Sequence, residues 1–183
     1  MATLSLSLLG TLQITLGEQP VTEFKSDKVR ALLAYLAVEA DRPHRREALA
    51  ALLWREMPDR SARSNLRDAL SNLRHVIGDR ARSGDRAAKP PFLLIERNTI
   101  QFNTSSNQWL DVSRFCELVE ADRGDQPAHQ QLAEAVKLYR GGFLEGFSLK
   151  DSPAFDDWSL LTRERLQRQA TLALHRLASD YEG

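Results

Sequence analysis

Apolar and polar residues alternate along the first part of the chain in the manner of a small antiparallel sheet. Leucines occupy every second position over residues 4–8, Gly10 interrupts the run, and the alternation resumes over residues 12–16. A period of two places successive side chains on opposite faces of a strand. Residues 17–20 contain the glycine and proline of a turn. The pattern therefore predicts a sheet of short strands within the first 24 residues.

Three stretches with helical spacing of apolar residues follow, over residues 28–40, 47–54 and 62–77. The residues predicted to bound these helices are Asp27 as cap of the first, Pro58 as end of the second, Asp59 or Ser61 as cap of the third, and Gly78 as its stop. A basic turn over residues 41–46 is expected between the first two helices.

The third of these helices has an unusual polar face. Its apolar stripe consists of Ala62, Leu66, Ala69, Leu70, Leu73, Val76 and Ile77. Its other face carries Arg63, Ser64, Arg67, Ser71 and Arg74, with Asp68 as its one acid. Arginine forks match phosphate oxygens and guanine edges, and small neighbours let a helix enter a groove. We predict a helix that lies in the major groove of DNA. The alternative is a solvated surface helix that is merely rich in arginine.

The chain after this helix is predicted to form a loop, a hairpin and then helices. Residues 79–91 are polar, basic and rich in breakers, so a loop is expected there. Residues 92–102 indicate a hairpin that turns near Arg97, Asn98 and Thr99. From Trp109 onward the spacing of apolar residues is that of helices. We therefore predict a first domain over residues 1–108 and an all-α domain over residues 109–183.

The predicted helices of the second half span residues 112–121, 128–139 and a long stretch from Pro153 or Phe155 to Tyr181. Asp111 is the expected cap of the first of them, and Asp125 or Pro127 the expected start of the second. On the long helix, the side chains expected to be buried are Trp158, Leu161, Leu166, Ala170, Leu174 and Leu177. Those expected in water are Arg163, Glu164, Arg168 and Arg176.

The order of elements indicates an α+β fold: an N-terminal sheet, two helices, an arginine-faced helix and a hairpin. This is the order of a winged helix, in which the third helix enters the major groove and the hairpin is the wing. The wing would contact phosphates or a minor groove through Arg97. The start of the second helix, near His44, Arg45 and Arg46, could take a phosphate on its backbone N–H groups. The candidate DNA-binding residues are Arg63, Ser64, Arg67, Ser71, Arg74, Arg45, Arg46 and Arg97.

The sequence resembles the SARP-type bacterial transcriptional activators. The segments that resemble their OmpR-type winged helix are residues 8–12 (LLGTL), 28–36 (KVRALLAYL), 46–54 (REALAALLW) and 62–74 (ARSNLRDALSNLR). Residues 111–115 (DVSRF), residues 138–144 (LYRGGFL) and Trp158 resemble the start of a bacterial transcriptional activator domain, a stack of tetratricopeptide-like helix pairs. The resemblance implies binding to double-stranded promoter DNA and recruitment of RNA polymerase holoenzyme, often as a homodimer. It also implies that the helical domain is truncated in this chain.

Composition refines this picture through the distribution of charge. The chain has 25 Lys and Arg and 25 Asp and Glu, so its formal net charge is zero. Residues 1–110 hold 16 basic and 12 acidic residues, a balance of +4, whereas residues 111–183 hold 9 and 13, a balance of −4. A basic half joined to an acidic half indicates two modules with different partners. The acidic half is expected to contribute little direct DNA contact.

Other classes of function are disfavoured by the residues present. The four histidines lack spaced cysteine or carboxylate partners, so neither a metal nor a cofactor is expected. Asp156 and Asp157 lack a second convergent group, and an enzyme is not predicted. The single Cys116 and the lack of a signal peptide or an apolar membrane span indicate a cytoplasmic protein. The alternative to a DNA-binding regulator is a protein-interaction module whose winged helix no longer binds DNA. Arginines on the open face of the third helix favour the regulator.

Overall fold

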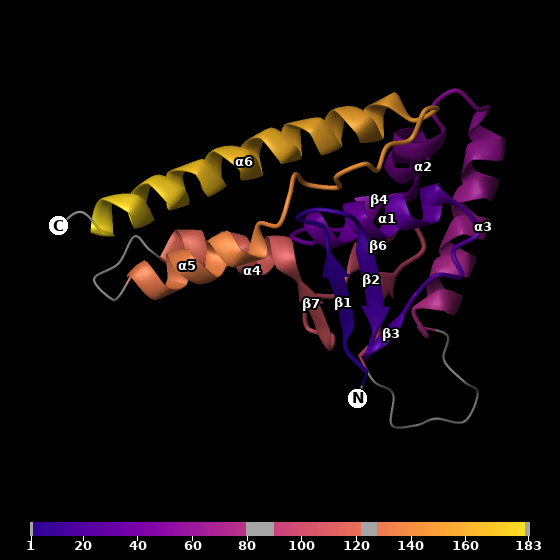
Figure 1. The fold of residues 1–183 in the computed structure, drawn as a ribbon. Helices are drawn as coiled ribbons and strands as arrows, with labels where there is room; N and C mark the ends of the chain where they lie inside the picture. The colour runs from indigo at the N-terminus through magenta and orange to yellow at the C-terminus, as the bar shows by residue number, and fades with distance from the viewer. Residues whose placement is uncertain (1, 80–89, 122–127, 182–183) are drawn as a thin grey trace. The chain divides into compact units, whose positions relative to one another are not determined.

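The computed structural model describes residues 2–79, 90–121 and 128–181. It has mixed α and β structure (Figure 1). The strands are β1 (Leu4–Ser7), β2 (Gln13–Leu16), β3 (Gln19–Pro20), β4 (His44–Arg45), β5 (Leu93–Ile95), β6 (Thr99–Phe102) and β7 (Gln108–Leu110). The helices are α1 (Asp27–Val38), α2 (Arg46–Trp54), α3 (Asp59–Val76), α4 (Asp111–Ala121), α5 (Ala128–Leu138) and α6 (Pro153–Tyr181). Most of the predicted loop over residues 79–91, and both Asp125 and Pro127, lie outside the described residues.

The chain divides into two compact units, each built from separate segments. Unit 1 comprises Met1–Ser5, Ile14–Trp109 and Leu149–Asp156. Unit 2 comprises Leu6–Gln13, Leu110–Ser148 and Asp157–Gly183. The strands form a four-stranded sheet in the order β3-β2-β1-β7 and a three-stranded sheet in the order β4-β6-β5.

Helix α1 forms the centre of unit 1. Seven of its residues are buried, on nearly all sides of the helix, and it contacts α2, α3 and β6. A helix that is apolar all round can only be stable inside a core, where neighbouring elements cover every face. Ile100 and Phe102 of β6 are also buried. The arginine-faced helix and the hairpin are thus attached to one core.

The helix ends in unit 1 differ from those predicted. Asp27 and Asp59 are not caps, because each is the first residue of its helix, preceded by Ser26 and Pro58 at the cap positions. Ser61 lies inside α3 and does not cap it either. Both aspartates still place a carboxylate near the positive end of the helix dipole. Pro58, expected to end the second helix, instead precedes α3 with an extended ψ of 141°.

The stop at Gly78 is confirmed. Helix α3 ends at Val76, and Gly78 has a φ of +72°, in the left-handed region that favours glycine after a helix.

Two segments that were not expected to be strands form strands in the structure. Residues 44–45 of the basic turn form β4, and residues 108–110, where the helical half was expected to begin, form β7. Strands of two or three residues carry too little alternation to be recognised in a sequence.

A buried carboxylate organises unit 2. Asp111 begins α4, and its two carboxylate oxygens accept hydrogen bonds from the backbone N–H of Leu8 at 2.9 and 2.8 Å and of Leu9 at 2.9 Å. Its exposed fraction is zero. Burial raises the pKa of Asp111, and the backbone donors and Arg140, whose guanidinium lies 3.6 Å away, oppose that rise. Asp111 was predicted to be a cap, but like Asp27 and Asp59 it is the first residue of its helix, and its carboxylate binds the chain that follows β1.

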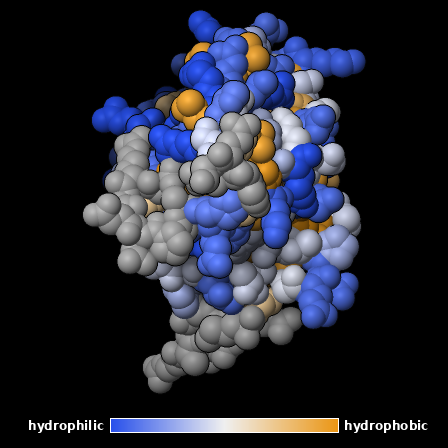
Figure 2. Space-filling model, turned by 60° about the vertical axis from the view of Figure 1, so that its left-hand side comes forward, coloured by the Kyte–Doolittle hydropathy of each residue, from blue (hydrophilic) through white to orange (hydrophobic). Residues whose placement is uncertain are grey.

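The buried face of α6 matches the predicted one only in part, while Glu164, Arg168 and Arg176 are exposed as predicted. Leu166 and Ala170 are buried as expected, but Leu161 and Leu174 are 66% and 51% exposed. Figure 2 shows one side of the whole molecule, whose coloured surface is mostly hydrophilic with separate hydrophobic patches. Arg163, expected in water, is half-buried and donates from Nε to the carbonyl of Phe143 at 2.9 Å. Leucines occur on several faces of this helix, so its sequence does not show which face has neighbours.

Candidate nucleic-acid interface

Helix α3 buries one face and opens the other as its pattern predicts. The residues Ala62, Leu66, Ala69, Leu70 and Leu73 are buried, and α3 contacts α1 and α2. Arg63, Ser64, Arg67 and Ser71 are all exposed. Their positions repeat at intervals of three and four residues, which keeps them on one side of a helix. The structure thus brings four of the eight candidate residues onto a single open surface, which we call the α3 face.

Arg74 lies in the last turn of α3, where its side chain is partly covered. It is half-buried, its Nε is buried, and its Nη2 donates to the backbone carbonyl of Asp79 at 3.4 Å. The Asp79 carboxylate in turn accepts hydrogen bonds from the N–H groups of Phe92 at 2.8 Å and Leu93 at 3.1 Å. Arg74 and Asp79 therefore join the end of α3 to the start of the hairpin, whereas the open arginines lie nearer the N-terminus of α3.

Asn72 is a residue that the sequence analysis did not single out. It is buried among the apolar residues of α3, accepts a hydrogen bond from the N–H of Lys25 at 2.9 Å, and donates to the carbonyl of Glu23 at 3.4 Å. These bonds satisfy backbone groups of the segment before α1. An amide on an apolar stripe is the signal that could have indicated this role, because a buried polar side chain needs partners.

The first turn of α2 carries an acid that contacts the α3 face. Glu47 Oε1 lies 3.7 Å from Nη2 of Arg63, and both side chains are more than half exposed. An ion pair of this length between exposed groups contributes little to stability. Its effect is local, because it holds one guanidinium of the α3 face toward α2 and places a negative charge beside it.

The hairpin has the geometry that the sequence predicted. Strands β5 and β6 are antiparallel, with Leu93 opposite Phe102 and Ile95 opposite Ile100. The turn between them is closed by a hydrogen bond from the N–H of Glu96 to the carbonyl of Thr99 at 3.0 Å. Arg97 is exposed at this turn. Strand β4 pairs with the other side of β6, so the start of α2 lies beside the same hairpin.

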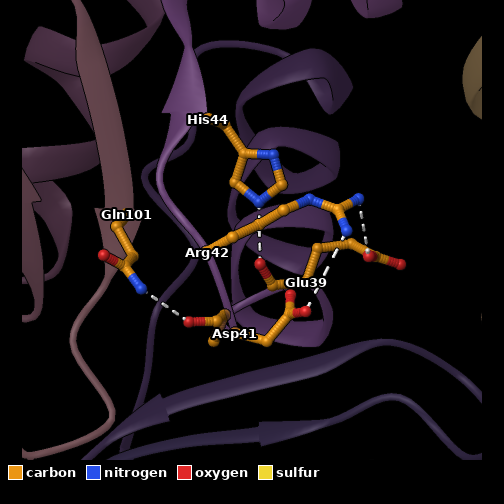
Figure 3. A network of polar contacts seen from close by, with 6 residues as sticks. Glu39, Asp41, Arg42, His44 and Gln101 are labelled. Atoms are coloured by element: carbon orange, nitrogen blue, oxygen red, sulfur yellow. Dashed lines mark hydrogen bonds and ion pairs between the residues drawn. The ribbon is translucent and has the colours of Figure 1, made fainter.

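His44 is buried and paired with groups of the protein. It is only 7% exposed, and its ring stacks edge-on against Tyr35 with centroids 5.2 Å apart. Its Nε2 donates to the carbonyl of Glu39 at 2.7 Å, since a carbonyl can only accept. Figure 3 shows this contact in a network with Arg42 and Gln101. Burial and the nearby Glu39 carboxylate raise the pKa of the Tyr35 hydroxyl. The network joins the end of α1 to β4 and β6.

Trp54 packs at the end of α2. It is 7% exposed at the end of α2, and the ammonium of Lys28 lies 5.4 Å from its ring centroid. Lys28 also forms an ion pair with Asp151 at 2.8 Å, which lowers the pKa of that carboxyl. Segment Leu149–Asp156 thus contacts α1 through this ion pair, and it contacts α2 through a hydrogen bond from the hydroxyl of Ser152 to the carbonyl of Leu53 at 2.7 Å.

Two further features were considered for the described residues, a metal-binding cluster and a membrane-spanning helix. Among residues 2–79, 90–121 and 128–181, no group of three or more His, Cys, Asp or Glu side chains is arranged to hold a metal ion. Within the same part of the chain, no helix combines the length and apolar character needed to cross a membrane.

Comparison with known proteins finds relatives that are transcriptional regulatory proteins. No protein-family model matches the chain. The chain is homologous to part of these proteins in sequence and in structure. The relatives are the transcriptional regulatory protein EmbR of Mycobacterium bovis and of Mycobacterium tuberculosis. Each is 34% identical to this chain over 152 residues, which cover 78% of the chain.

A solved structure supports the same relationship. The structure of Mycobacterium tuberculosis EmbR in complex with a low-affinity phosphopeptide has a TM-score of 0.72 and 27% identity, over 97% of this chain. The match covers 45% of that EmbR chain, and the chain spans only 36% of the length of the curated relatives. The similarity therefore concerns part of EmbR.

Proposed function

We propose that this chain is a sequence-specific DNA-binding transcriptional regulator of the SARP type, with an OmpR-type winged helix in its first part. In this proposal α3 lies in the major groove, where Arg63 and Arg67 reach base edges and Ser64 and Ser71 allow close approach. The hairpin β5–β6 is the wing, and Arg97 at its turn contacts the sugar-phosphate backbone or a minor groove. Arg45 is exposed beside the wing and suits a phosphate contact.

The observation that carries the proposal is the α3 face. A helix packed on α1 and α2 through one stripe exposes arginines and small polar residues on the other, with Asp59 in its first turn and Asp68 as the exposed acids. An ordinary solvated helix mixes acids and bases on its open side, with pairs at intervals of three or four residues. The homology to EmbR, a transcriptional regulatory protein, agrees with this interpretation.

The helical part of the chain is proposed to be the beginning of a bacterial transcriptional activator domain, divided from the winged helix near residue 108. Activation through RNA polymerase holoenzyme and assembly as a homodimer on promoter DNA are further parts of the proposal, supported by resemblance alone. The acidic balance of −4 over residues 111–183 makes direct DNA contact by this part unfavourable.

In-vitro selection of bound duplexes from a random pool tests the proposal. We expect enrichment of a defined sequence, and binding that weakens steeply with salt because phosphate contacts release counterions. Recovery of a random pool with weak, sequence-independent binding would contradict direct readout by α3. Absence of duplex binding at low salt would favour the alternative, a protein-interaction module.

Arg97→Ala is expected to weaken binding to all duplexes to a similar extent. A single lost phosphate contact flattens the plot of log affinity against log salt by about one unit. Sequence preference should be retained, because a phosphate contact carries no base information. The measurement is fluorescence anisotropy with selected and scrambled duplexes at several salt concentrations. A changed base preference with an unchanged slope would instead place Arg97 on a base edge.

Glu47→Gln is expected to raise affinity for DNA about threefold at low salt. The substitution removes a negative charge next to the α3 face and releases Arg63 from its ion pair, while the shape of the side chain is kept. Glu18→Gln, in the exposed turn between β2 and β3, is the matched control for loss of one acid. Equal effects of the two variants would show that only net charge matters, and that Glu47 has no specific influence on Arg63.

A further inference from the structure

Two adjacent arginines, Arg45 and Arg46, have different surroundings although their charges are the same. Arg45 lies in β4 and is exposed. Arg46 begins α2 and is half-buried, with its Nε buried. Its Nη2 donates a hydrogen bond to the backbone carbonyl of Glu96 at 3.1 Å. The guanidinium of Arg46 is therefore directed at the hairpin turn and is partly withdrawn from solvent.

Arg46 also binds this turn through its backbone. Its N–H donates to the carbonyl of Asn98 at 3.0 Å. The two accepting carbonyls belong to the residues on either side of Arg97, so the Glu96–Arg97 and Asn98–Thr99 peptide units are both held by one residue. The turn is also closed within itself, by a hydrogen bond from the N–H of Glu96 to the carbonyl of Thr99 at 3.0 Å and by one from the hydroxyl of Thr99 to the carboxylate of Glu96 at 3.3 Å. Arg46 adds the two bonds that tie this turn to the start of α2.

We propose that Arg46 is a positioning residue that fixes the turn bearing Arg97, and that it does not itself contact phosphate. This inference rests on the proposed function, since Arg97 is the DNA-contacting group. Holding the turn in its bound conformation lowers the cost of ordering it on association, which increases affinity without a new contact. The carbonyl of Glu96 occupies one of the donors that a phosphate would need.

A double-mutant cycle tests the proposal in the whole chain. The variants are Arg46→Met, Arg97→Met and the pair. Methionine keeps the apolar stem that packs against the protein and removes every side-chain donor, while the backbone N–H bond to the carbonyl of Asn98 remains. Arg45→Met, alone and with Arg97→Met, is the matched control. Affinity and its salt dependence are measured on the selected duplex.

If Arg46 acts through Arg97, Arg97→Met should cost about fivefold in affinity in the wild-type background and less than about twofold when Arg46→Met is present. The salt slope of the double variant should be flattened by about one unit in total. Arg45→Met and Arg97→Met should be additive. Additive losses for Arg46 and Arg97, with the slope flattened by about two units, would show a phosphate contact by Arg46 and overturn the proposal.

Amide hydrogen exchange provides a second test that does not involve DNA. Exchange at the N–H of Glu96 should be about fivefold faster in Arg46→Met than in the wild type, and unchanged in Arg45→Met. Unchanged exchange in Arg46→Met would overturn the positioning role. If the wild-type chain shows no salt-dependent duplex binding, the proposed function fails, while faster exchange in Arg46→Met would still establish that Arg46 holds the turn.

Discussion

Arg67→Ala is expected to lower the affinity for a selected duplex by about 1–3 kcal/mol and to relax the preference at particular base pairs. Arg67 is exposed on the α3 face, four residues after Arg63 and on the same side of the helix. A bidentate contact from a guanidinium to a guanine edge discriminates against other bases, and alanine removes it. Arg63→Ala should have an effect of the same kind, although the guanidinium of Arg63 also forms an ion pair with Glu47. The measurement is binding to the selected duplex and to variants with single base-pair changes.

Arg168→Ala is the matched control for this substitution. Arg168 is an exposed arginine of α6, in the acidic half of the chain, and its loss should leave base preference unchanged. If Arg63→Ala and Arg67→Ala both bind as tightly as the wild type with the same preference, α3 is not the recognition helix. A loss of affinity in Arg168→Ala equal to that in Arg67→Ala would show that DNA binding is not confined to the first part of the chain.

Asp111→Ala is expected to lower the free energy of unfolding by about 2–5 kcal/mol, because it leaves buried donors without acceptors. The N–H groups of Leu8 and Leu9 both donate to this carboxylate, and the side chain is fully buried. Asp111→Asn keeps one accepting oxygen and should have an intermediate effect. Urea denaturation followed by tryptophan fluorescence measures the change, since Trp158 belongs to the same unit as Asp111.

Asp157→Ala is the control for removal of a carboxylate that is exposed at the start of α6. Its effect should lie within about 0.5 kcal/mol of zero. A loss below about 1 kcal/mol in Asp111→Ala would mean that the chain after β1 does not depend on this carboxylate. A loss in Asp111→Asn as large as that in Asp111→Ala would show that its charge matters more than its accepting oxygens.

The sequence predicted local structure correctly where the pattern of apolar residues within a single element is sufficient to define it. The 18 residues of α3 repeat their apolar positions over five turns, and the turn at Arg97 lies between a short apolar run, residues 92–95, and an alternating run, residues 99–102. Both predictions are confirmed as local structure, because hydrophobic periodicity is set within the element. The DNA-binding roles of their arginines remain predictions.

The sequence was less informative where a residue's role depends on a distant partner. Arg45 and Arg46 cannot be distinguished in the sequence. They differ because the hairpin turn over residues 96–98 packs against Arg46 and accepts its hydrogen bonds. Asp111 was recognised as a helix start, but the two N–H groups that it binds lie more than 100 residues earlier. For the same reason the buried face of α6 was assigned partly to the wrong leucines. Long-range contacts of this kind are not encoded in local periodicity.

The interleaved segments of the two units affect how the protein is made. Unit 1 includes Leu149–Asp156, and unit 2 includes Leu6–Gln13. At a synthesis rate of about 5–20 residues per second, roughly 8–30 s pass between the first residues and the segment that completes unit 1. During that time, Leu53 lacks the hydroxyl of Ser152, and Lys28 lacks Asp151. Neither unit can reach its final structure on the ribosome before most of the chain has emerged, so the nascent N-terminal part depends on late residues for its completion.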